Sequence, residues 1–321
     1  MRAPHDPFAG LKAIWRSRAR RIVVPVLALI AAAWLIAHLV RGFSWPLFVS
    51  ALRATPPWGI IAAVVMTPLS YLCLSVTEWF SLHSLGHRLS WPRTVRVAVA
   101  AYTVSNSLGF SLATGTATRL RLYGAAGLGP GAVTATALVA GTAVTLSGVV
   151  AAGLGLVIEP TVFAQAIHTR PDLIRIVGVI LLSPALLWFI VLRAPRAGTQ
   201  PLVRSHAGRA LALLAGLADW ALSGAALYIL SPDASLTGFP VFLTVFVLGS
   251  VVSAATGVPG GIGVFEAVVL GLSALTAQTH QSPTALILYR VIYSLGPLVL
   301  ISLALGAERI IRPRRPGTQP T

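Results

Sequence analysis

Six ionisable residues lie inside or at the edges of strongly apolar stretches of this 321-residue chain. Three are acidic and three are basic: Glu78, Asp219, Glu266, Arg119, Arg121 and Arg290. A charged side chain in a hydrocarbon environment is costly, and it usually faces a partner of opposite charge or a polar cavity. Equal numbers of acids and bases permit complete internal pairing, whereas an arginine that reaches a cavity offers bidentate geometry to a phosphate. The residues therefore indicate buried ion pairs or a polar binding site.

Arg119 and Arg121 are two residues apart in the stretch SNSLGFSLATGTATRLRLYGAAGLG (105–129). On a regular helix this spacing separates two side chains by about 200°, so both cannot enter one pocket. We expect one of them, with Arg119 the better candidate, to face a cavity as a phosphate ligand, and the other to face the headgroup layer. The alternative is that both extend along the lipid surface to the membrane interface, as long basic side chains do.

Glu266 follows a proline–glycine turn in VPGGIGVFE (258–266). A carboxylate in the first turn of a helix is favoured by the helix dipole, so a capping role explains it without any ligand. Gly260 and Gly261 could expose backbone N–H groups to an anion, or they could form only the turn. Both interpretations of the acid and of the glycines stay open at this level.

Asp219 lies about three turns into an apolar stretch, within LADWALSGAALYIL (217–230). A carboxylate at that depth requires a buried partner or a functional role. Arg290, early in the last apolar stretch, is the partner we favour for Asp219, with Glu266 as its alternative partner. Glu78 lies nearer a helix end, where it either pairs or is hydrated at the interface.

The sequence gives no sign of catalytic chemistry. It holds no nucleophile–base arrangement, phosphate-binding glycine loop or metal-ligand spacing, and His83 and His87 have no third ligand nearby. The single cysteine, Cys73, excludes an intrachain disulfide and a cysteine metal cluster. The net charge is +16, but the basic residues form no stripe with interleaved aromatic residues, so nucleic acid is not the expected partner. We expect no enzyme activity, no cofactor and no metal.

Eight apolar stretches determine the class of protein. They cover 22–40, 58–77, 94–112, 132–157, 174–192, 207–231, 239–257 and 285–306. A helix needs about 20 residues to cross a bilayer, and these stretches are apolar on all sides rather than on one face. The composition agrees, with 56% hydrophobic and 10% charged residues. We predict an all-α polytopic membrane protein, whose first stretch is an uncleaved helix and not a signal peptide.

Eight full crossings would conflict with the distribution of arginine. The basic loop over 193–209 would then lie outside, although such loops collect on the cytoplasmic side. The conflict disappears if 94–130 enters the membrane and returns as a re-entrant hairpin, with its break at Ala113-Thr114-Gly115-Thr116. Proline and clustered glycine at 258–263 predict a second hairpin over 239–277. About six full crossings then remain, and both termini are cytoplasmic.

The two halves repeat the same order of elements. The first unit (55–157) consists of helix 58–77, hairpin 94–130 and helix 132–157, and the second (207–306) of helix 207–231, hairpin 239–277 and helix 285–306. Their orientations in the membrane are opposite, which is the pattern of inverted-repeat transporters, whose substrate site lies where the broken helices meet. We treat 1–321 as one integral membrane domain with basic cytoplasmic ends at 1–21 and 307–321.

Three stretches resemble the transmembrane domain of the lysylphosphatidylglycerol synthase/flippase (multiple peptide resistance factor) family and its stand-alone relatives. They are the stretches 105–129 and 217–230 quoted above, and VPGGIGVFEAVVLGL (258–272). They occur in order, so the resemblance covers nearly the whole chain from about residue 55. It implies a bacterial inner-membrane protein that moves aminoacylated phospholipid between leaflets.

The resemblance also implies roles for individual residues. Arg119 and Arg121 match the arginines after the first turn, Asp219 matches the intramembrane acid, and Glu266 matches the acid after the proline–glycine turn. The chain departs from the family pattern at Thr114-Gly115-Thr116, where a double glycine is expected. It also ends at Thr321, which leaves no room for the soluble synthase domain, so we expect no synthesis of lysyl lipid.

The leading hypothesis is translocation of phospholipid, including aminoacylated or cationic-headgroup lipid, with Arg119 or Arg290 binding the phosphate and the acids balancing the headgroup. A proton-coupled secondary transporter of a small polar solute is the alternative, with Asp219 or Glu266 carrying the proton. An accessory protein without transport activity is a third hypothesis, but it has no evident need for buried charges. Membrane phospholipid is the expected partner, and a homo-oligomer is left open.

The predicted topology can be tested by cysteine labelling in intact cells. With Cys73 replaced by serine, a cysteine at Thr199 is expected to resist a membrane-impermeant maleimide, because the basic 193–209 loop lies inside. A cysteine at Thr169, beside Arg170 in a loop that the same topology places outside, should react and serves as the matched control. Labelling at position 199 from outside would exclude the two-hairpin topology.

Overall fold

The computed structural model describes residues 45–108, 111–191, 206–231, 236–256, 258–276 and 282–311, all of them helix, turn or short connection. The chain divides into two units, Met1–Phe48 and Val49–Thr321. Helix α3 (Trp45–Ala54) spans this boundary. The second unit contains the remaining described helices. Its helices are α4 (Pro57–Ser84), α5 (Trp91–Leu108), α6 (Ser111–Gly124), α7 (Pro130–Ile158), α8 (Pro160–Ala166), α9 (Pro171–Val191), α11 (His206–Tyr228), α12 (Phe239–Thr256), α13 (Val264–Thr276), α14 (Pro283–Tyr289) and α15 (Gly296–Ile311).

Proline sets the start of many of these helices. It is the first residue of α4, α7, α8, α9 and α14. The first helical N–H has no intrahelical partner, so proline loses nothing there, and its fixed φ already suits the helix. The sequence therefore marks these boundaries locally.

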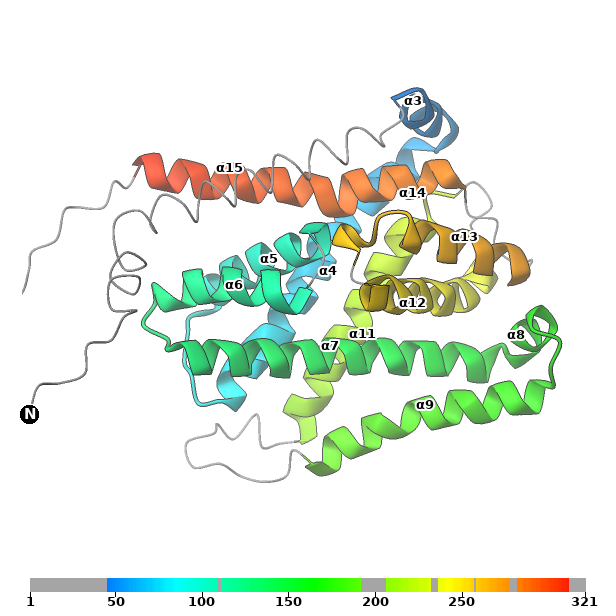
Figure 1. Cartoon of the computed structure of the whole chain (residues 1–321), viewed down its shortest axis with the longest axis horizontal. Coiled ribbons are helices and arrows are strands. Elements are labelled where there is room, and N and C mark those ends of the chain that lie inside the picture. Colours follow the sequence, from blue (N-terminus) through cyan, green and yellow to red (C-terminus); the bar gives the residue numbers. More distant parts are fainter. Residues whose placement is uncertain are drawn as a thin grey trace, which may run out of the picture. The chain divides into compact units, whose positions relative to one another are not determined.

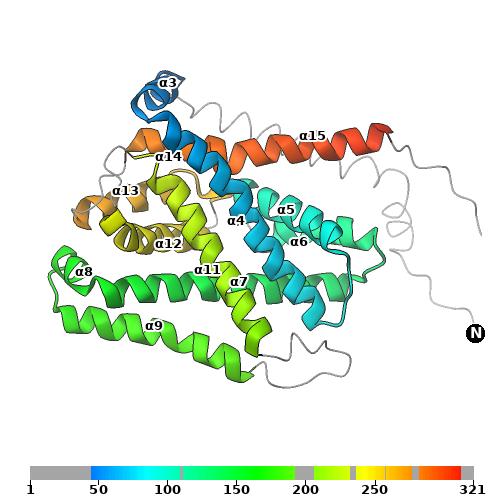
Figure 2. The same ribbon diagram turned by 180° about the vertical axis from the view of Figure 1, so that it is seen from behind.

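Helices α4 and α11 lie side by side and run in opposite directions, as Figure 2 shows. The Thr55 hydroxyl, just before α4, donates to the carbonyl of Leu230, just after α11. Midway along the pair, the Ser70 hydroxyl donates to Asp219. The residue number rises on one helix as it falls on the other, which is the register of an antiparallel pair. This pair brings Asp219 against α4.

Helix α7 packs against α11 through small residues. A β-carbon at Gly148 would lie 2.8 Å from the Trp220 ring, so only glycine admits the indole there. The Trp220 Nε1–H donates to the Val144 carbonyl at 2.8 Å, and the Ser147 hydroxyl donates to the Leu213 carbonyl at 3.0 Å. Close approach at small residues, with a few polar contacts between helices, is the usual packing of helices in membranes.

Two helical hairpins are present, α5 with α6 and α12 with α13 (Figure 1). In the second hairpin α12 ends at Thr256, and Val264 begins α13 after a turn with Gly260, Gly261 and Gly263 at positive φ, in agreement with the predicted break. In the first hairpin the predicted break is wrong. Residues 113–116 are helical within α6, whereas α5 ends at Leu108 and α6 begins at Ser111. Whether the hairpins are re-entrant, and whether the units form an inverted repeat, stay predictions.

Between α14 and α15 the chain forms a π-helix, η3 (Arg290–Leu295). Pro297, in the first turn of α15, has no N–H and cannot bond the carbonyl four residues earlier, that of Tyr293. The Tyr71 hydroxyl of α4 donates to this carbonyl instead, at 3.3 Å. Wide turns of this kind are frequent at functional sites, and this one lies against α4 and α5.

Six helices in the described ranges are long and apolar enough to cross a membrane: Pro57–Ser84, Pro130–Ile158, Pro171–Trp188, His206–Tyr228, Phe239–Thr256 and Pro283–Ala304. Phe239–Thr256 is the first arm of the second predicted hairpin, and the others correspond to predicted crossings. The predicted crossing at 22–40 lies outside the described residues. The all-helical, polytopic membrane fold expected from the sequence is confirmed.

Glycine also holds α7 against α9. A β-carbon at Gly153 would lie 2.9 Å from the Gly178 carbonyl oxygen, and one at Gly178 would lie 2.8 Å from the Gly153 carbonyl oxygen. Gly153→Leu is therefore expected to separate the helices and lower the free energy of unfolding by about 1–3 kcal/mol, measured by thermal or denaturant unfolding in detergent. Gly131→Leu, on the same helix but with open space around it, is the control. Equal losses in both variants would contradict the close contact.

Candidate functional site

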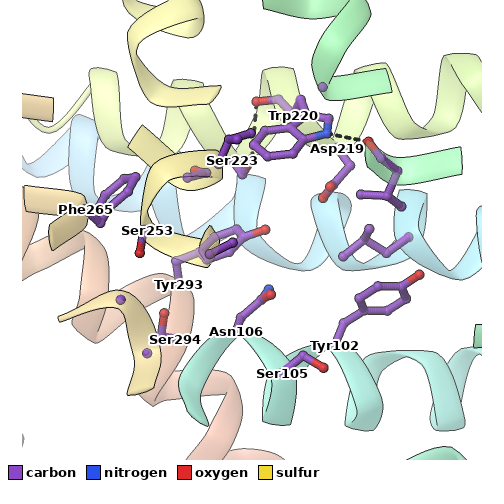
Figure 3. A pocket seen from close by; sticks show the side chains of 18 of the residues that line it. Tyr102, Ser105, Asn106, Asp219, Trp220, Ser223, Ser253, Phe265, Tyr293 and Ser294 are labelled. Carbon is purple, nitrogen blue, oxygen red and sulfur yellow. Dashed lines mark hydrogen bonds between the residues drawn. The ribbon is translucent and has the colours of Figure 1, made fainter. Parts of the chain in front are cut away.

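A cavity of about 490 Å³ lies between the two hairpins and the helices that flank them. Its walls come from α4, α5, α6, α7, α11, α12, the turn before α13, α13 itself, and the α14–η3 segment. Figure 3 shows Asp219 and Trp220 of α11, Tyr102 and Asn106 of α5, and Tyr293 of η3 around the same space. Polar groups from segments far apart in the sequence thus converge in an otherwise apolar molecule.

The turn of the second hairpin lies against the end of α5 at this cavity. A β-carbon at Gly260 would lie 2.8 Å from the carbonyl oxygen of Ser107, which belongs to the last turn of α5. The Ser107 hydroxyl donates to the Ser294 carbonyl of the π-helix at 3.2 Å. Gly260 has φ +62°, which glycine adopts at little cost, and only glycine fits so close to the neighbouring backbone. Gly260 therefore both forms the turn and allows the turn to lie against the end of α5.

Arg119 forms a bidentate ion pair with Glu78. Its Nε and Nη2 donate to the two carboxylate oxygens at 2.8 Å each, and the Tyr123 hydroxyl donates to Glu78 Oε1 at 3.2 Å. The guanidinium also lies over the Tyr102 ring, 4.7 Å from its centre. Glu78 is fully buried and 4% of Arg119 is exposed, so the hydrated interfacial position considered for Glu78 is wrong. The pair fixes α6 to α4, and of its two residues only Arg119 lines the cavity.

Arg121 is exposed on the other side of α6. The divergence expected from the spacing is therefore observed, with Arg119 facing inward. Gly115, one turn before Arg119, is buried against that guanidinium, and a β-carbon there would lie 2.9 Å from Arg119 Nη1. Gly115 thus allows the arginine to lie close to its own helix, and it is not part of a turn.

Glu266 has two roles at once. Its Oε2 accepts from the Gly263 N–H at 2.8 Å, which is the reciprocal bond of a capping box at the start of α13. Its Oε1 accepts from Nε of Arg290. Arg290 also donates through Nη1 to the Gly260 carbonyl at 3.1 Å and through Nη2 to the Gly261 carbonyl at 3.3 Å. The ion pair therefore fixes the shape of the second turn.

Asp219 is not paired with Arg290, so the favoured pairing is wrong. Arg290 is engaged by Glu266 and the glycine carbonyls, and within the described part of the chain no cation forms an ion pair with Asp219. Its carboxylate accepts from the Ser70 hydroxyl, which is also 2.8 Å from the Tyr293 hydroxyl. Asp219 is 6% exposed and lines the cavity. It is a buried acid bonded to the neutral Ser70 hydroxyl, which in turn contacts the Tyr293 hydroxyl.

Comparison with protein families places this fold. The family model described as the lysylphosphatidylglycerol synthase TM region matches residues 24–301. The chain belongs to this family. Inner membrane protein YbhN of Escherichia coli (strain K12) is 27% identical over 302 residues, which cover 89% of this chain and 91% of YbhN. Uncharacterized protein slr0712 of Synechocystis sp. is 26% identical over 282 residues, covering 86% and 88% of the two chains. The resemblance inferred from three stretches is confirmed.

In this member of the family, several residues around Asp219 and the cavity were not predicted from the sequence. Ser70 donates to Asp219 and the Tyr71 hydroxyl donates to the Tyr293 carbonyl. Tyr289 and Tyr293 line the cavity, and their rings stack with their centres 5.0 Å apart. A signal was available, because LYRVIYSLG (288–296) places two tyrosines four residues apart around Arg290 in an apolar segment. Ser70 carried none, since serine is common where helices of membrane proteins pack.

A double-mutant cycle tests the buried ion pair between Arg119 and Glu78, which we call the sealed pair. Glu78→Gln or Arg119→Gln alone is expected to lower the free energy of unfolding by roughly 3–5 kcal/mol, because each leaves a buried charge without its partner. The double variant should lose less than the sum of the two, measured by unfolding in detergent. Arg121→Gln, on the exposed face of the same helix, should change stability by less than about 0.5 kcal/mol. Additive losses would show that the pair does not form.

Proposed function

We propose that this protein translocates phospholipid, including aminoacylated or other cationic-headgroup lipid, between the leaflets of the bacterial cytoplasmic membrane, with both termini in the cytoplasm. The observation that carries the proposal is the composition of one cavity. It contains a partly exposed arginine, Arg290, and a carboxylate, Asp219, that has no cationic partner among the described residues. One anion site and one cation site in the same cavity suit a headgroup that carries both charges.

Arg290 is the better phosphate ligand of the two arginines that line the cavity. Arg119 has two donors committed to Glu78 and a side chain that is 5% exposed. The Arg290 side chain is 20% exposed, and two of its hydrogen bonds go to neutral carbonyls, which a phosphate can replace with stronger, charge-assisted bonds. A phosphate arriving through the cavity thus meets Arg290 first.

Asp219 is the complementary site for an ammonium group. Trp220, Tyr289 and Tyr293 line the same cavity, and aromatic faces attract organic cations. The headgroup would cross through the polar cavity while the hydrocarbon chains stay outside that cavity, so a small polar path suffices. Membership of the lysylphosphatidylglycerol synthase TM family and similarity to a protein named as an inner membrane protein support the assignment.

Proton-coupled transport of a small polar solute is the second candidate. Among the described residues Asp219 forms no ion pair and accepts a hydrogen bond from the Ser70 hydroxyl, and carboxylates inside membrane spans mark proton relays in pumps and transporters. In that case Asp219 would be protonated on one side of the membrane and would release its proton on the other. The two functions make different demands on the substrate, because only the first requires a lipid.

Reconstitution in liposomes separates the two functions. Vesicles with phospholipids fluorescent on a chain should show protein-dependent exchange between leaflets, scored by quenching from outside. Arg290→Gln is expected to slow exchange about tenfold for every headgroup, equivalent to about 1.4 kcal/mol. Asp219→Asn should slow exchange of lipids with an amino group more than that of phosphatidylglycerol, because it removes the ammonium site.

Arg121→Gln is the matched control and should exchange lipid at the wild-type rate, since Arg121 lies outside the cavity. Thermal unfolding in detergent establishes that each variant is folded. Arg290→Lys keeps the positive charge beside Glu266, so it separates loss of the phosphate ligand from loss of the ion pair. Exchange no faster than in protein-free vesicles would reject lipid translocation. Solute uptake driven by a proton gradient and abolished by Asp219→Asn would then favour the second candidate.

A further inference from the structure

A second, smaller cavity of about 180 Å³ lies between α13 and α14. Its walls are apolar side chains on both helices: Leu270, Pro283, Leu286 and Ile287. The remaining lining residues are Glu266 and Arg290. An apolar pocket that ends on an ion pair has the polarity of a phospholipid, whose hydrocarbon chains adjoin a charged phosphate. We call this cavity the α13–α14 pocket.

The α13–α14 pocket and the main cavity meet at Arg290, which lines both. The Arg290–Glu266 ion pair, which lies where the two cavities meet, is open to a ligand, because 20% of the Arg290 side chain and 23% of the Glu266 side chain are exposed. By contrast, the exposed fractions in the Arg119–Glu78 pair are 5% and 0%. Of these two pairs, only Arg290–Glu266 is therefore open to a ligand that approaches between α13 and α14.

The surroundings of the α13–α14 pocket favour hydrocarbon over water as its occupant. α13 is a short apolar helix, and α14 begins a segment, Pro283–Ala304, that is long and apolar enough to cross a membrane. Lipid chains are as apolar as leucine side chains, so moving a chain from the bilayer into such a space has no desolvation cost. Water there would lose hydrogen bonds along the apolar walls.

We propose that the α13–α14 pocket holds a hydrocarbon chain of the transported lipid, whose phosphate is bound by Arg290. The inference rests on the proposed function and narrows it, because the substrate then enters sideways between α13 and α14 and carries its phosphate next to its hydrophobic part. Glu266 gives up Arg290 to the phosphate and stays in place, since its second oxygen remains bonded to the Gly263 N–H. The ion pair is thus exchanged and not simply broken.

Photo-crosslinking of the full-length protein in liposomes tests the pocket. A phospholipid with a diazirine on one chain is expected to label residues on the α13 and α14 walls, identified by peptide mapping. Leu270→Trp fills the pocket and should lower this labelling and lipid exchange at least fivefold. Leu275→Trp is the matched control: it lies on the same helix, carries the same change and has a side chain that already faces outward, with 57% of the residue exposed. It should leave both readouts unchanged.

A competition experiment separates a chain site from a headgroup site. Excess unlabelled phospholipid should abolish the labelling, whereas excess water-soluble glycerophosphoethanolamine should not. If the soluble ester competes equally well, or if Leu270→Trp leaves labelling and exchange at the wild-type level, the chain site is overturned. Labelling confined to outward-facing residues such as Leu275 would overturn it as well.

The two proposals fail in distinguishable ways. Labelling that Leu270→Trp removes, in a protein that does not exchange lipid, would overturn translocation and leave the lipid site. Exchange at a normal rate in Leu270→Trp would overturn the site and leave translocation. Thermal unfolding of both tryptophan variants in detergent, with the wild type alongside, shows that neither result reflects a failure to fold.

Discussion

The cost of placing charge in hydrocarbon governs the arrangement of this molecule. Arg119 would be expensive between apolar helices without a partner, and its two-pronged pairing with Glu78 removes that cost while joining α6 to α4. Arg290 and Glu266 do the same for the second hairpin, with weaker burial and with backbone carbonyls as additional acceptors. Each hairpin is thus fixed to the rest of the protein by one arginine and one carboxylate, and the cavity lies between these two attachments.

The same cost applies to the irregular backbone. Non-helical backbone at membrane depth persists only where it is buried in protein or lines a polar cavity. Here the carbonyls of Gly260 and Gly261 accept from Arg290, and the Tyr293 carbonyl, which Pro297 leaves without its helical partner, accepts from Tyr71. These irregular segments line or adjoin the cavity because their polar groups need partners. A ligand that competes for Arg290 therefore acts directly on the shape of the second turn.

The two ion pairs differ in exposure, and this difference determines which of their charges a ligand can reach. The sealed pair has a mainly structural role, whereas the open pair connects the main cavity with the α13–α14 pocket. Asp219 completes the set as an acid bonded to Ser70, with tyrosine rings around it. Phosphate binding at Arg290 and ammonium binding at Asp219 would place the two charges of a headgroup in one space. Lipid transport by this protein would therefore depend on the two charges that a ligand can reach, Arg290 and Asp219, and not on the sealed pair.

The sequence alone determined the class of protein, most helix limits and the set of ionisable residues within the apolar stretches. Apolar length predicts helices in a membrane because backbone polar groups must be satisfied there, and proline and glycine mark the ends of helices by local geometry. The opposite directions of Arg119 and Arg121 also follow from helical periodicity. The first turn was misplaced because Gly115 is tolerated inside a helix. That glycine serves the close approach of the Arg119 side chain, which no local pattern shows.

Only the tertiary structure decided which charges pair. Three acids and three bases allow many pairings, and the sequence favoured Asp219 with Arg290 because both lie in the second half of the chain. In the fold, Glu266 is held by its helix N-terminus within reach of Arg290, and α4 brings Glu78 to Arg119 and Ser70 to Asp219. Partner choice depends on side-chain directions across packed helices. Those directions are set by long-range packing, and a single sequence carries no record of it.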